Sequence, residues 1–528
     1  MQRTEPETLI VMHYHMLPGG VRSVLHSSLA ALAQAGWFAG RSLQLLVGRN
    51  SGVKSFVSSL ASLGLQIDVK VDSRLDYNDG PWSDRQSFQD AAAELARWLL
   101  AQARGSSLYW VHNPTLGKNP LLTAAIFAAV EKAARLDGPF RFLYHIHDFA
   151  ECGRLQNLKR LRLCWQEGGL RQIYPVSDNV AFAVLNSGDY RKLISAGIPS
   201  EVVSHLPNPI ALSKGGRQCS REAIAAKLEE YARVHGYRFH SERQWWTMPI
   251  RLIRRKNVIE ALFLAAMAKE PVQLLVTLDA NSAPEKPYAE AVKAFIRSEG
   301  HAAVVGFGHN LVGTSFSMDD LLYGSAAVVT TSFLEGFGFA FLEGPNRGRP
   351  LLGRNLSDVT EDFRGAGFPA GSLYENFMVP APRKIRQTLA DKGTRFARQC
   401  SRQLGMAQAA IEKFAAEIEA LYQGDTVDLS FLDLEGQLFL ARRLRDPSFI
   451  RELCFLNPDA ARPVIFPADF AGRLQEQYGL EAHAQRLSRT FETLFHRQGV
   501  RQVPDDVSDR LVELYFSPQY HRPLMGDW

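Results

Sequence analysis

Two glutamates, Glu335 and Glu343, flank a glycine-rich turn in the segment TSFLEGFGFAFLEG. The preceding run AAVVTTS (326–332) is short, apolar and β-branched, which is typical of a buried parallel strand. GFGF (336–339) holds too much glycine to continue that strand, and the residues from Phe339 onward favour a helix. Free N–H groups at a helix start suit phosphate, and a carboxylate on each side suits sugar hydroxyls. The segment therefore predicts a sugar-nucleotide site, with a plain strand-to-helix turn as the alternative.

A second group of residues suited to phosphate lies in PIRLIRRKN, where Arg251 and Lys256 stand five residues apart. We expect Arg251 to lie in a strand and Lys256 to begin a helix. Two cations at a strand end would bind a diphosphate. The alternative is a solvated basic turn, because Arg254 and Arg255 crowd the same place.

Two further glycine turns follow predicted strands. LPGGV contains Gly19 and Gly20 and resembles a phosphate loop in type, although it lacks the G-x-G-x-x-G spacing. An ordinary tight turn explains it equally well. GFGHN contains Gly306, and such a turn would let a nucleotide base lie against the backbone.

The histidines of HIHDF close another predicted strand. His145 and His147 point to the same face, and a histidine pair suggests a metal ion. A pair at this spacing without an acidic partner is a poor site, and the chain has no D-x-D triplet, so we predict no metal. His147 is expected to bond a substrate hydroxyl. A buried structural role is the alternative, and it is favoured for His145 and for His112.

These residues need strands to position them, and the first 210 residues alternate between strand and helix patterns. The predicted strands are 8–15, 42–48, 66–72, 107–112, 141–147, 172–177 and EVVSHLP (201–207), and the predicted helices lie near 21–35, 53–63, 88–103 and 120–135. Such alternation indicates a parallel sheet with helices on both faces.

The alternation stops after LPNPI (206–210) and resumes at PIRLIR (249–254). Residues 213–247 are polar and helix-prone, apart from QWW (244–246), which either covers a cleft or is core. We therefore predict an α/β fold with two doubly wound domains, 1–210 and 211–424, and a ligand at the strand ends between them. A mostly helical extension, 425–528, is too aromatic to be disordered. It should fold either against the body, which we favour, or as a dimerising element.

Composition limits the partners. The chain has 528 residues, a net charge of +5 and no dense Lys/Arg tract, so nucleic acid is not expected. Five scattered cysteines fit a reducing cytoplasm, and no apolar run is long enough to span a membrane. Residues 153–172 would form an amphipathic helix that contacts a membrane surface or an anionic acceptor, or that simply covers the sheet.

Taken together, the motifs IRLIRRKNVIEAL, VVGFG and DDLLYGSAAVVTTSFLEGFGFAFLEG…GRPLL resemble the C-terminal half of retaining glycosyltransferases of the GT-B fold, most closely family 4. PGGV, the histidine at 147, VS (176–177) and PNPI match the N-terminal half more loosely. The resemblance covers roughly residues 1–420 and departs from the family at Ile250, where glycine is usual.

The resemblance implies a metal-independent, cofactor-free transfer of a hexose, with retention, from a nucleotide-diphosphate sugar to an unidentified glycan, lipid or small molecule. The donor-binding and catalytic residues that it implies are Lys256 and Arg251 on the diphosphate, Glu335 beside the sugar, Glu343 on the ribose, the amides of Gly336, Phe337 and Gly338, Gly19 and Gly20 from the opposite domain, and His147 near the transferred sugar. A non-catalytic nucleotide-sugar-binding scaffold and an epimerase or hydrolase are the alternatives. Oligomeric state stays open.

Overall fold

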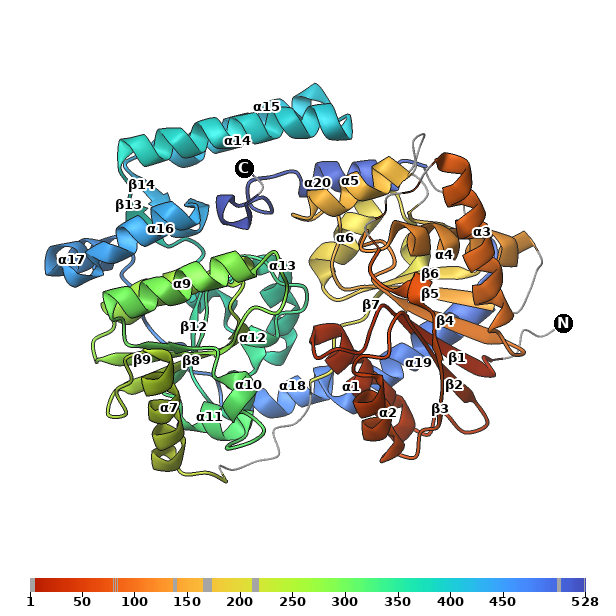
Figure 1. Ribbon diagram of the computed structural model, residues 1–528, viewed down its shortest axis with the longest axis horizontal. Coiled ribbons are helices and arrows are strands. Elements are labelled where there is room, and N and C mark those ends of the chain that lie inside the picture. The colour runs from red at the N-terminus through yellow and green to blue at the C-terminus, as the bar shows by residue number, and fades with distance from the viewer. Residues whose placement is uncertain are drawn as a thin grey trace. The chain divides into compact units, whose positions relative to one another are not determined.

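The computed structural model describes residues 5–78, 80, 82, 84–135, 140–164, 173–210, 218–500, 505–526 and 528. The chain divides into two compact units (Figure 1). Unit 1 comprises Met1–Ala211 and Gln475–Phe516, and unit 2 comprises Leu212–Leu474 and Ser517–Trp528. Each unit has its own parallel sheet, and the segment after residue 424 contributes to both.

Among the described residues, unit 1 contains a seven-stranded sheet in the order β3-β2-β1-β4-β5-β6-β7. Its strands are β1 Thr8–His13, β2 Ser42–Val47, β3 Ile67–Val71, β4 Ser107–His112, β5 Phe140–Ile146, β6 Val180–Val184 and β7 Val203–His205. All neighbouring strands are parallel. The strand order reverses between β1 and β4, and ligands of doubly wound sheets bind at the carboxyl ends beside such a switch point.

Helices cover the sheet of unit 1. They are α1 Gly20–Gln34, α2 Val53–Ala61, α3 Arg85–Ala101, α4 Pro120–Arg135, α5 Leu155–Cys164, α6 Ser187–Ser195, α19 Leu480–His496 and α20 Val507–Tyr515. α19, blue in Figure 1, inserts Leu487, Phe491 and Leu494 into the core beside β1 and β2. The prediction that the C-terminal extension folds and packs on the body agrees with this arrangement.

Unit 2 contains, in its described part, a five-stranded sheet in the order β10-β9-β8-β11-β12. Its strands are β8 Gln244–Arg251, β9 Val272–Leu278, β10 Ala303–Val305, β11 Ala327–Thr330 and β12 Leu351–Gly353, all parallel. The order reverses between β8 and β11. The switch point therefore lies at the carboxyl ends of β8 and β11. Arg251 ends β8, and the chain continues from β11 toward Glu335.

The helices of unit 2 follow its strands and then form the mostly helical C-terminal region. They are α7 Arg221–His235, α8 Val258–Met267, α9 Lys286–Glu299, α10 Gly308–Leu311, α11 Met318–Gly324, α12 Phe339–Leu342, α13 Ser357–Thr360, α14 Arg383–Leu404, α15 Gln408–Tyr422, α16 Leu434–Ala441 and α17 Pro447–Leu456, with α18 Phe470–Tyr478 leading to unit 1. A short antiparallel pair, β13 Met378–Pro380 and β14 Thr426–Asp428, adds to this region. The predicted α/β class, with parallel sheets and a helical C-terminal region, is confirmed.

One local prediction differs from the structure, and for a second segment the structure decides between the two alternatives that the sequence left open. The strand expected at 172–177 is wrong, because the strand is β6, Val180–Val184; Pro175 has no N–H for a sheet ladder, and Gln172 lies outside the described residues. QWW is core rather than a cleft cover, because β8 begins at Gln244 and Trp245 is fully buried.

The amphipathic segment predicted at 153–172 forms α5 over the part that is described. Its Leu155, Leu158 and Leu161 are almost fully buried, so the helix covers the protein interior with its apolar face. Nowhere in the described chain is there a helix with the length and hydropathy needed to cross a bilayer.

Glu151 is a buried carboxyl that joins the C-terminal helix α20 to the rest of unit 1. Tyr174 donates its hydroxyl to both carboxyl oxygens at 3.2 Å, and Ser508 of α20 donates at 2.6 Å. Burial raises the pKa of Glu151 to about 7, although the hydrogen bonds from Ser508 and Tyr174 oppose the rise. The carboxyl is therefore ionised more easily in the unfolded chain than in the folded one.

We expect Glu151 to contribute a decrease in the stability of unit 1 as the pH rises from about 4.5 to about 7, because only the unfolded chain releases the Glu151 proton in that window. The buried neutral histidines contribute an increase of opposite sign, so the variant must be compared with the wild type. Below 4.5 the carboxyl is protonated in both states and no penalty exists. Glu151→Gln should remove this slope, which is worth about 3 kcal/mol over the window. The measurement is the melting temperature of the wild type and of Glu151→Gln between pH 4 and 8. Parallel curves of melting temperature against pH for the two proteins would contradict the prediction.

Candidate active site

Lys256 and Glu335 meet at the switch point of unit 2. Lys256 closes the turn Arg254–Lys256 after β8, and its side-chain ammonium forms an ion pair with Oε1 of Glu335. Arg255 reaches the other carboxylate oxygen, with Nη1 3.1 Å from Oε2. The backbone N–H of Phe333 donates to the carbonyl of Arg255 at 3.1 Å, which joins the two loops. Residues that lie 79 positions apart in the sequence are thus brought together.

Lys256 and Glu335 each favour the charged form of the other. Burial acts to raise the pKa of Glu335, but the charges of Lys256 and Arg255 outweigh it and lower that pKa. Burial lowers the pKa of Lys256, and the Glu335 carboxylate opposes this. Two cations therefore share one carboxylate. The surplus positive charge suits an anionic ligand such as a diphosphate.

Arg251 contributes to the same edge of the sheet. It ends β8 and is half-buried, and burial lowers the pKa of its guanidinium. The chain returns at once toward the Lys256 turn, because the N–H of Ile253 donates to the carbonyl of Arg251 at 2.9 Å and the N–H of Lys256 donates to Ile253 at 3.0 Å.

The backbone that holds Lys256 is fixed by its neighbour. Asn257 has φ 48°, a left-handed conformation that is uncommon for a residue other than glycine. Its amide donates to Glu260 at 2.8 Å and its Oδ1 accepts from Gln437 at 3.0 Å. The hydroxyl of Thr331 donates to the carbonyl of Lys256 at 2.9 Å. These contacts leave the Lys256 turn little freedom.

Glu260 belongs to a buried charge network that the sequence analysis did not identify. Arg354 lies between Glu260, at 2.8 Å, and Asp428, at 2.7 Å, and only 1% of its surface is exposed. Tyr374 donates to Glu260 at 2.7 Å. Arg522, from the end of the chain, bonds Ser430 beside this group. The members are far apart in sequence, so no local spacing could have revealed them.

The glycine turn of GFGF is shaped by packing. Gly338 has φ +90°, and a Cβ there would lie 2.5 Å from Cγ1 of Val359. Phe337 is buried between Phe339 and Phe363, with ring centroids at 4.9 and 5.5 Å. A helix does begin at Phe339, as predicted, but it is a single turn. Its dipole is correspondingly small, so the fixed cations carry most of the electrostatics here. Gly336 is half-buried in this turn.

Glu343 lies at the end of α12, half-buried. Burial raises the pKa of its carboxyl, Asp319 adds to the rise, and Arg347 and Lys256 oppose it. Arg347 donates to the Glu343 carbonyl at 2.7 Å and pairs with Asp319 at 2.6 Å. Glu343 is therefore close enough to Lys256 for their charges to interact, as a shared ligand requires.

Gly306 forms a tight turn between β10 and α10, with φ +83°. A Cβ there would lie 3.4 Å from Cβ of Asp279 and 3.5 Å from the hydroxyl of Tyr231. The same hydroxyl donates to the carbonyl of Val305 at 3.3 Å. A side chain larger than hydrogen would therefore be strained and crowded at this strand end.

In unit 1, Gly19 and Gly20 begin α1 and face open space. A Cβ on Gly20 would meet nothing within 4 Å, and one on Gly19 would meet only a backbone oxygen at 3.9 Å. Gly19 also lines a surface pocket of about 250 Å³ with Arg22 and His26. Packing does not require glycine at either position, which leaves room for a ligand near this backbone.

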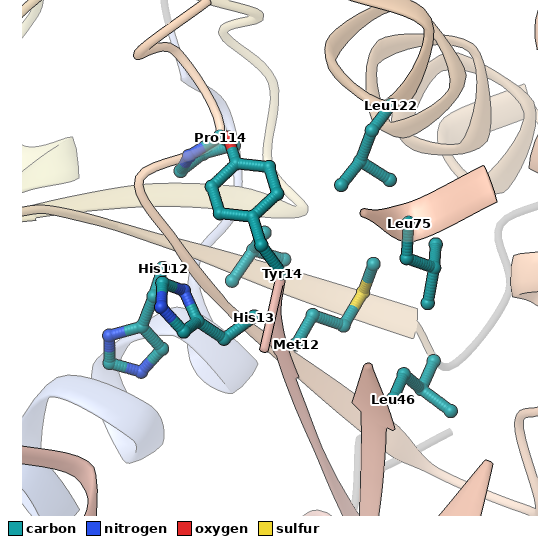
Figure 2. Close-up of a pocket in the computed structure, with 9 residues that line it drawn as sticks. Met12, His13, Tyr14, Leu46, Leu75, His112, Pro114 and Leu122 are labelled. Atoms are coloured by element: carbon teal, nitrogen blue, oxygen red, sulfur yellow. The ribbon is translucent and has the colours of Figure 1, made fainter. Parts of the chain in front are cut away.

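His147 follows β5 and belongs to a group of buried histidines at the carboxyl ends of neighbouring strands. His13 ends β1 and His112 ends β4, on either side of the switch point. A nitrogen of His112 bonds a nitrogen of His147 at 2.8 Å, and Trp110 donates to Nδ1 of His145 at 3.2 Å. Figure 2 shows His13 and His112 at the edge of a cavity of only about 10 Å³. The sequence analysis assigned no role to His13 and favoured a buried structural role for His112.

These imidazoles are neutral at physiological pH. Burial lowers the pKa of His147 to about 4 and that of His13 to about 3. Burial also lowers the pKa of His112 well below its ordinary value, and the nearby His145 adds to this. The site in unit 1 therefore offers uncharged hydrogen-bonding groups, whereas the site in unit 2 offers fixed positive charge.

The chain is similar in sequence to a synthase and in structure to several solved proteins. No family model matches the chain. The chain is 28% identical over 435 residues to mannosylglucosyl-3-phosphoglycerate synthase of Petrotoga mobilis, which covers 81% of this chain and 79% of that protein.

Two solved structures are similar to the chain at low sequence identity. The lipopolysaccharide outer core galactosyltransferase WaaB, in its apo form, is 10% identical with a TM-score of 0.46 and covers 92% of this chain and 98% of its own. Anabaena HepE in complex with UDP-glucose is 15% identical with a TM-score of 0.46 and covers 67% and 82%. At these scores the fold class rests on the two sheets themselves.

We expect Lys256→Met to reduce kcat/KM about 100- to 1000-fold, because it removes one fixed donor from the place where negative charge would develop. The measurement is initial-rate kinetics with a nucleotide-sugar donor. Lys392→Met is the matched control, since Lys392 pairs with Asp433 at 2.9 Å on a helix away from the strand ends. Equal rates for the two variants would remove Lys256 from the site.

We expect the KM for the donor to rise as the pH falls through the raised pKa of Glu343, because protonation removes a carboxylate acceptor for hydroxyls. Glu343→Gln should show a high KM that does not change with pH in this range. Glu299→Gln, which alters a carboxylate paired with Arg445 at 3.4 Å, should keep the wild-type profile. A wild-type KM that is flat down to pH 4.5 would contradict the assignment.

Proposed function

We propose that this protein is a retaining glycosyltransferase that moves a hexose from a nucleotide-diphosphate sugar to an acceptor hydroxyl. The observation that carries the proposal is the Lys256–Glu335 pair with Arg255, held at the carboxyl ends of β8 and β11. Surplus positive charge at the switch point of a doubly wound sheet is where a diphosphate would bind.

In the proposed reaction, Lys256 and Arg251 stabilise the negative charge that develops on the departing diphosphate. The bond from the anomeric carbon to the diphosphate oxygen breaks, and a bond to the acceptor oxygen forms on the same face of the sugar. The acceptor proton passes to the diphosphate, so that charge and atoms balance. Glu335 lies beside the sugar and Glu343 accepts the ribose hydroxyls. His147 bonds a sugar hydroxyl.

The relative suggests the acceptor class. Its name describes a product in which sugars are joined to 3-phosphoglycerate. We therefore propose that the acceptor of this chain is a small glycoside that carries a phosphoglycerate group. The chain and the relative share most of their lengths, which supports this choice over a glycan or a lipid.

The experiment is a matrix of UDP-, GDP- and ADP-sugars against glucosyl-3-phosphoglycerate, 3-phosphoglycerate and neutral disaccharides, with products read by mass spectrometry and the new linkage by NMR. Retention of the anomeric configuration and a preference for phosphoglycerate acceptors are expected. Free sugar formed without any acceptor would favour a hydrolase. Donor binding without turnover on any acceptor would favour a non-catalytic binding protein.

We expect transfer to continue in saturating EDTA, because fixed cations would supply the stabilisation that a divalent ion gives in other enzymes. Rates with and without EDTA, after the protein has been purified in chelator, provide the measurement. Loss of activity that Mn²⁺ or Mg²⁺ restores would contradict a metal-independent reaction.

A further inference from the structure

The bond between His112 and His147 is the most specific contact among the buried histidines of unit 1. The distance between Nδ1 of His112 and Nε2 of His147 is 2.8 Å. The two rings are stacked, with centroids 5.1 Å apart and an interplanar angle of 27°. Only 2% of His112 and 7% of His147 is exposed. A hydrogen bond at this depth fixes both ring orientation and proton position.

The residue after His112 holds the backbone of the same partner. Asn113 has φ 55°, and its side-chain oxygen accepts from the N–H of His147 at 2.7 Å and from that of Asp148 at 3.3 Å. The N–H of Asn113 donates to the carbonyl of His145 at 2.9 Å, and the hydroxyl of Tyr14 donates to the carbonyl of Asn113 at 3.0 Å. Two consecutive residues thus position the side chain and the main chain of His147.

The proton positions follow from the partners of the other nitrogens. The indole N–H of Trp110 donates to Nδ1 of His145, so neutral His145 carries its own proton on Nε2. The rings of His145 and His112 lie 5.0 Å apart. Nε2 of His112 is buried and has no hydrogen-bond partner among the described residues. A proton there would be a second buried N–H with no acceptor, next to that of His145.

His112 therefore keeps its proton on Nδ1 and donates it to His147. Nε2 of His112 then carries an unpaired lone pair, which costs less than a second buried N–H without an acceptor. His147 accepts on Nε2, so its own proton must be on Nδ1. Because His147 is neutral, this N–H is its one remaining donor.

The same contacts argue against a metal ion. Nitrogens of His112, His145 and His147 lie within 4.8 Å of one another, which is the composition of a three-histidine site. Trp110, however, occupies the lone pair of His145 Nδ1, and the proton occupies Nε2, so His145 has no lone pair to give. The remaining two histidines are too few ligands for a tetrahedral ion.

We propose that His112 is a positioning residue that holds His147 in its Nδ1–H tautomer, so that His147 acts on the substrate as a hydrogen-bond donor and not as a base. The group that accepts the hydrogen bond from His147 would be a hydroxyl oxygen of the transferred sugar, and this part of the proposal rests on the proposed function. The tautomer of His147 is a property of the protein alone.

The test is a long-range ¹H–¹⁵N correlation spectrum of the full chain labelled with ¹⁵N-histidine. Signals of His147 are assigned by their loss in His147→Gln. We expect the protonated nitrogen of His147 to be Nδ1 in the wild type. His112→Leu should move the proton partly or wholly to Nε2, whereas His112→Asn, whose amide can donate from the same place, should keep it on Nδ1.

Kinetics form the second readout. His112→Leu should lower kcat about 10- to 100-fold with little change in the donor KM, and His112→Asn should restore most of the rate. His483→Leu is the control, because it removes another buried histidine of unit 1, one that bonds Ser28 at 2.8 Å, and should lower stability without altering the His147 spectrum.

Several outcomes would overturn the inference. They are a wild-type His147 protonated on Nε2, a His147 spectrum unchanged in His112→Leu, and one tightly bound metal ion per chain by elemental analysis. If His112→Leu does not fold, the wild-type and His112→Asn spectra decide. If His147 has the expected tautomer but the protein transfers no sugar, only the proposed function is wrong. If the protein transfers sugar but His147 has the other tautomer, only this inference is wrong.

Discussion

The site in unit 2 depends on one buried contact, the guanidinium of Arg354 between Glu260 and Asp428. A charge removed from water costs several kcal/mol unless partners and hydrogen bonds surround it, and here both sides of the guanidinium are occupied. Such a pair contributes little net stability, but it permits only one arrangement of the three segments that meet there. Glu260 then fixes Asn257, and Asn257 fixes the turn that carries Lys256. The C-terminal region is part of this support, since Asp428 closes β14 and Arg522 lies over the ring of Phe431 at 3.8 Å.

In each unit, an asparagine with positive φ lies in the backbone next to the candidate site. Among the described residues other than glycine, Asn113 and Asn257 are the ones with positive φ. One follows the strand that ends in His112, and the other follows Lys256. In each case the asparagine side chain bonds the segment that it must hold, the N–H of His147 or the carboxylate of Glu260. Strained backbone persists only where surrounding contacts compensate for it, and it gathers at functional sites. The two asparagines therefore fix the backbone next to the candidate site residues Lys256 and His147.

Much of this fold is readable from the sequence, because strands such as Ser107–His112 and Ala327–Thr330 lie in short, mostly apolar runs separated by helical patterns. The sequence-based prediction fails where the strand propensity of a segment conflicts with its ability to pair with a neighbouring strand. QIYPVS has the β-branched residues of a strand, yet Pro175 cannot join a ladder, and the apolar run Val180–Val184 pairs instead. The site divides in the same way. Glu335 and Lys256 stand beside recognisable turns. Arg354 and His112, in contrast, acquire their importance from partners 94 and 35 residues away, and a single sequence carries no local signal for such pairs.

The electrostatic contrast between the two sites follows from these supports. In unit 2, two cations share the carboxylate of Glu335, so positive charge remains for a ligand with several negative oxygens. In unit 1, burial keeps the histidines neutral, and a neutral imidazole held by a second imidazole can donate to a hydroxyl without attracting a phosphate. A glycosyl transfer needs both kinds of recognition, one for the leaving diphosphate and one for the uncharged sugar. Deep burial beside other histidines keeps His147 uncharged, and this gives the clustering of neutral histidines at three strand ends a chemical purpose within the proposed reaction.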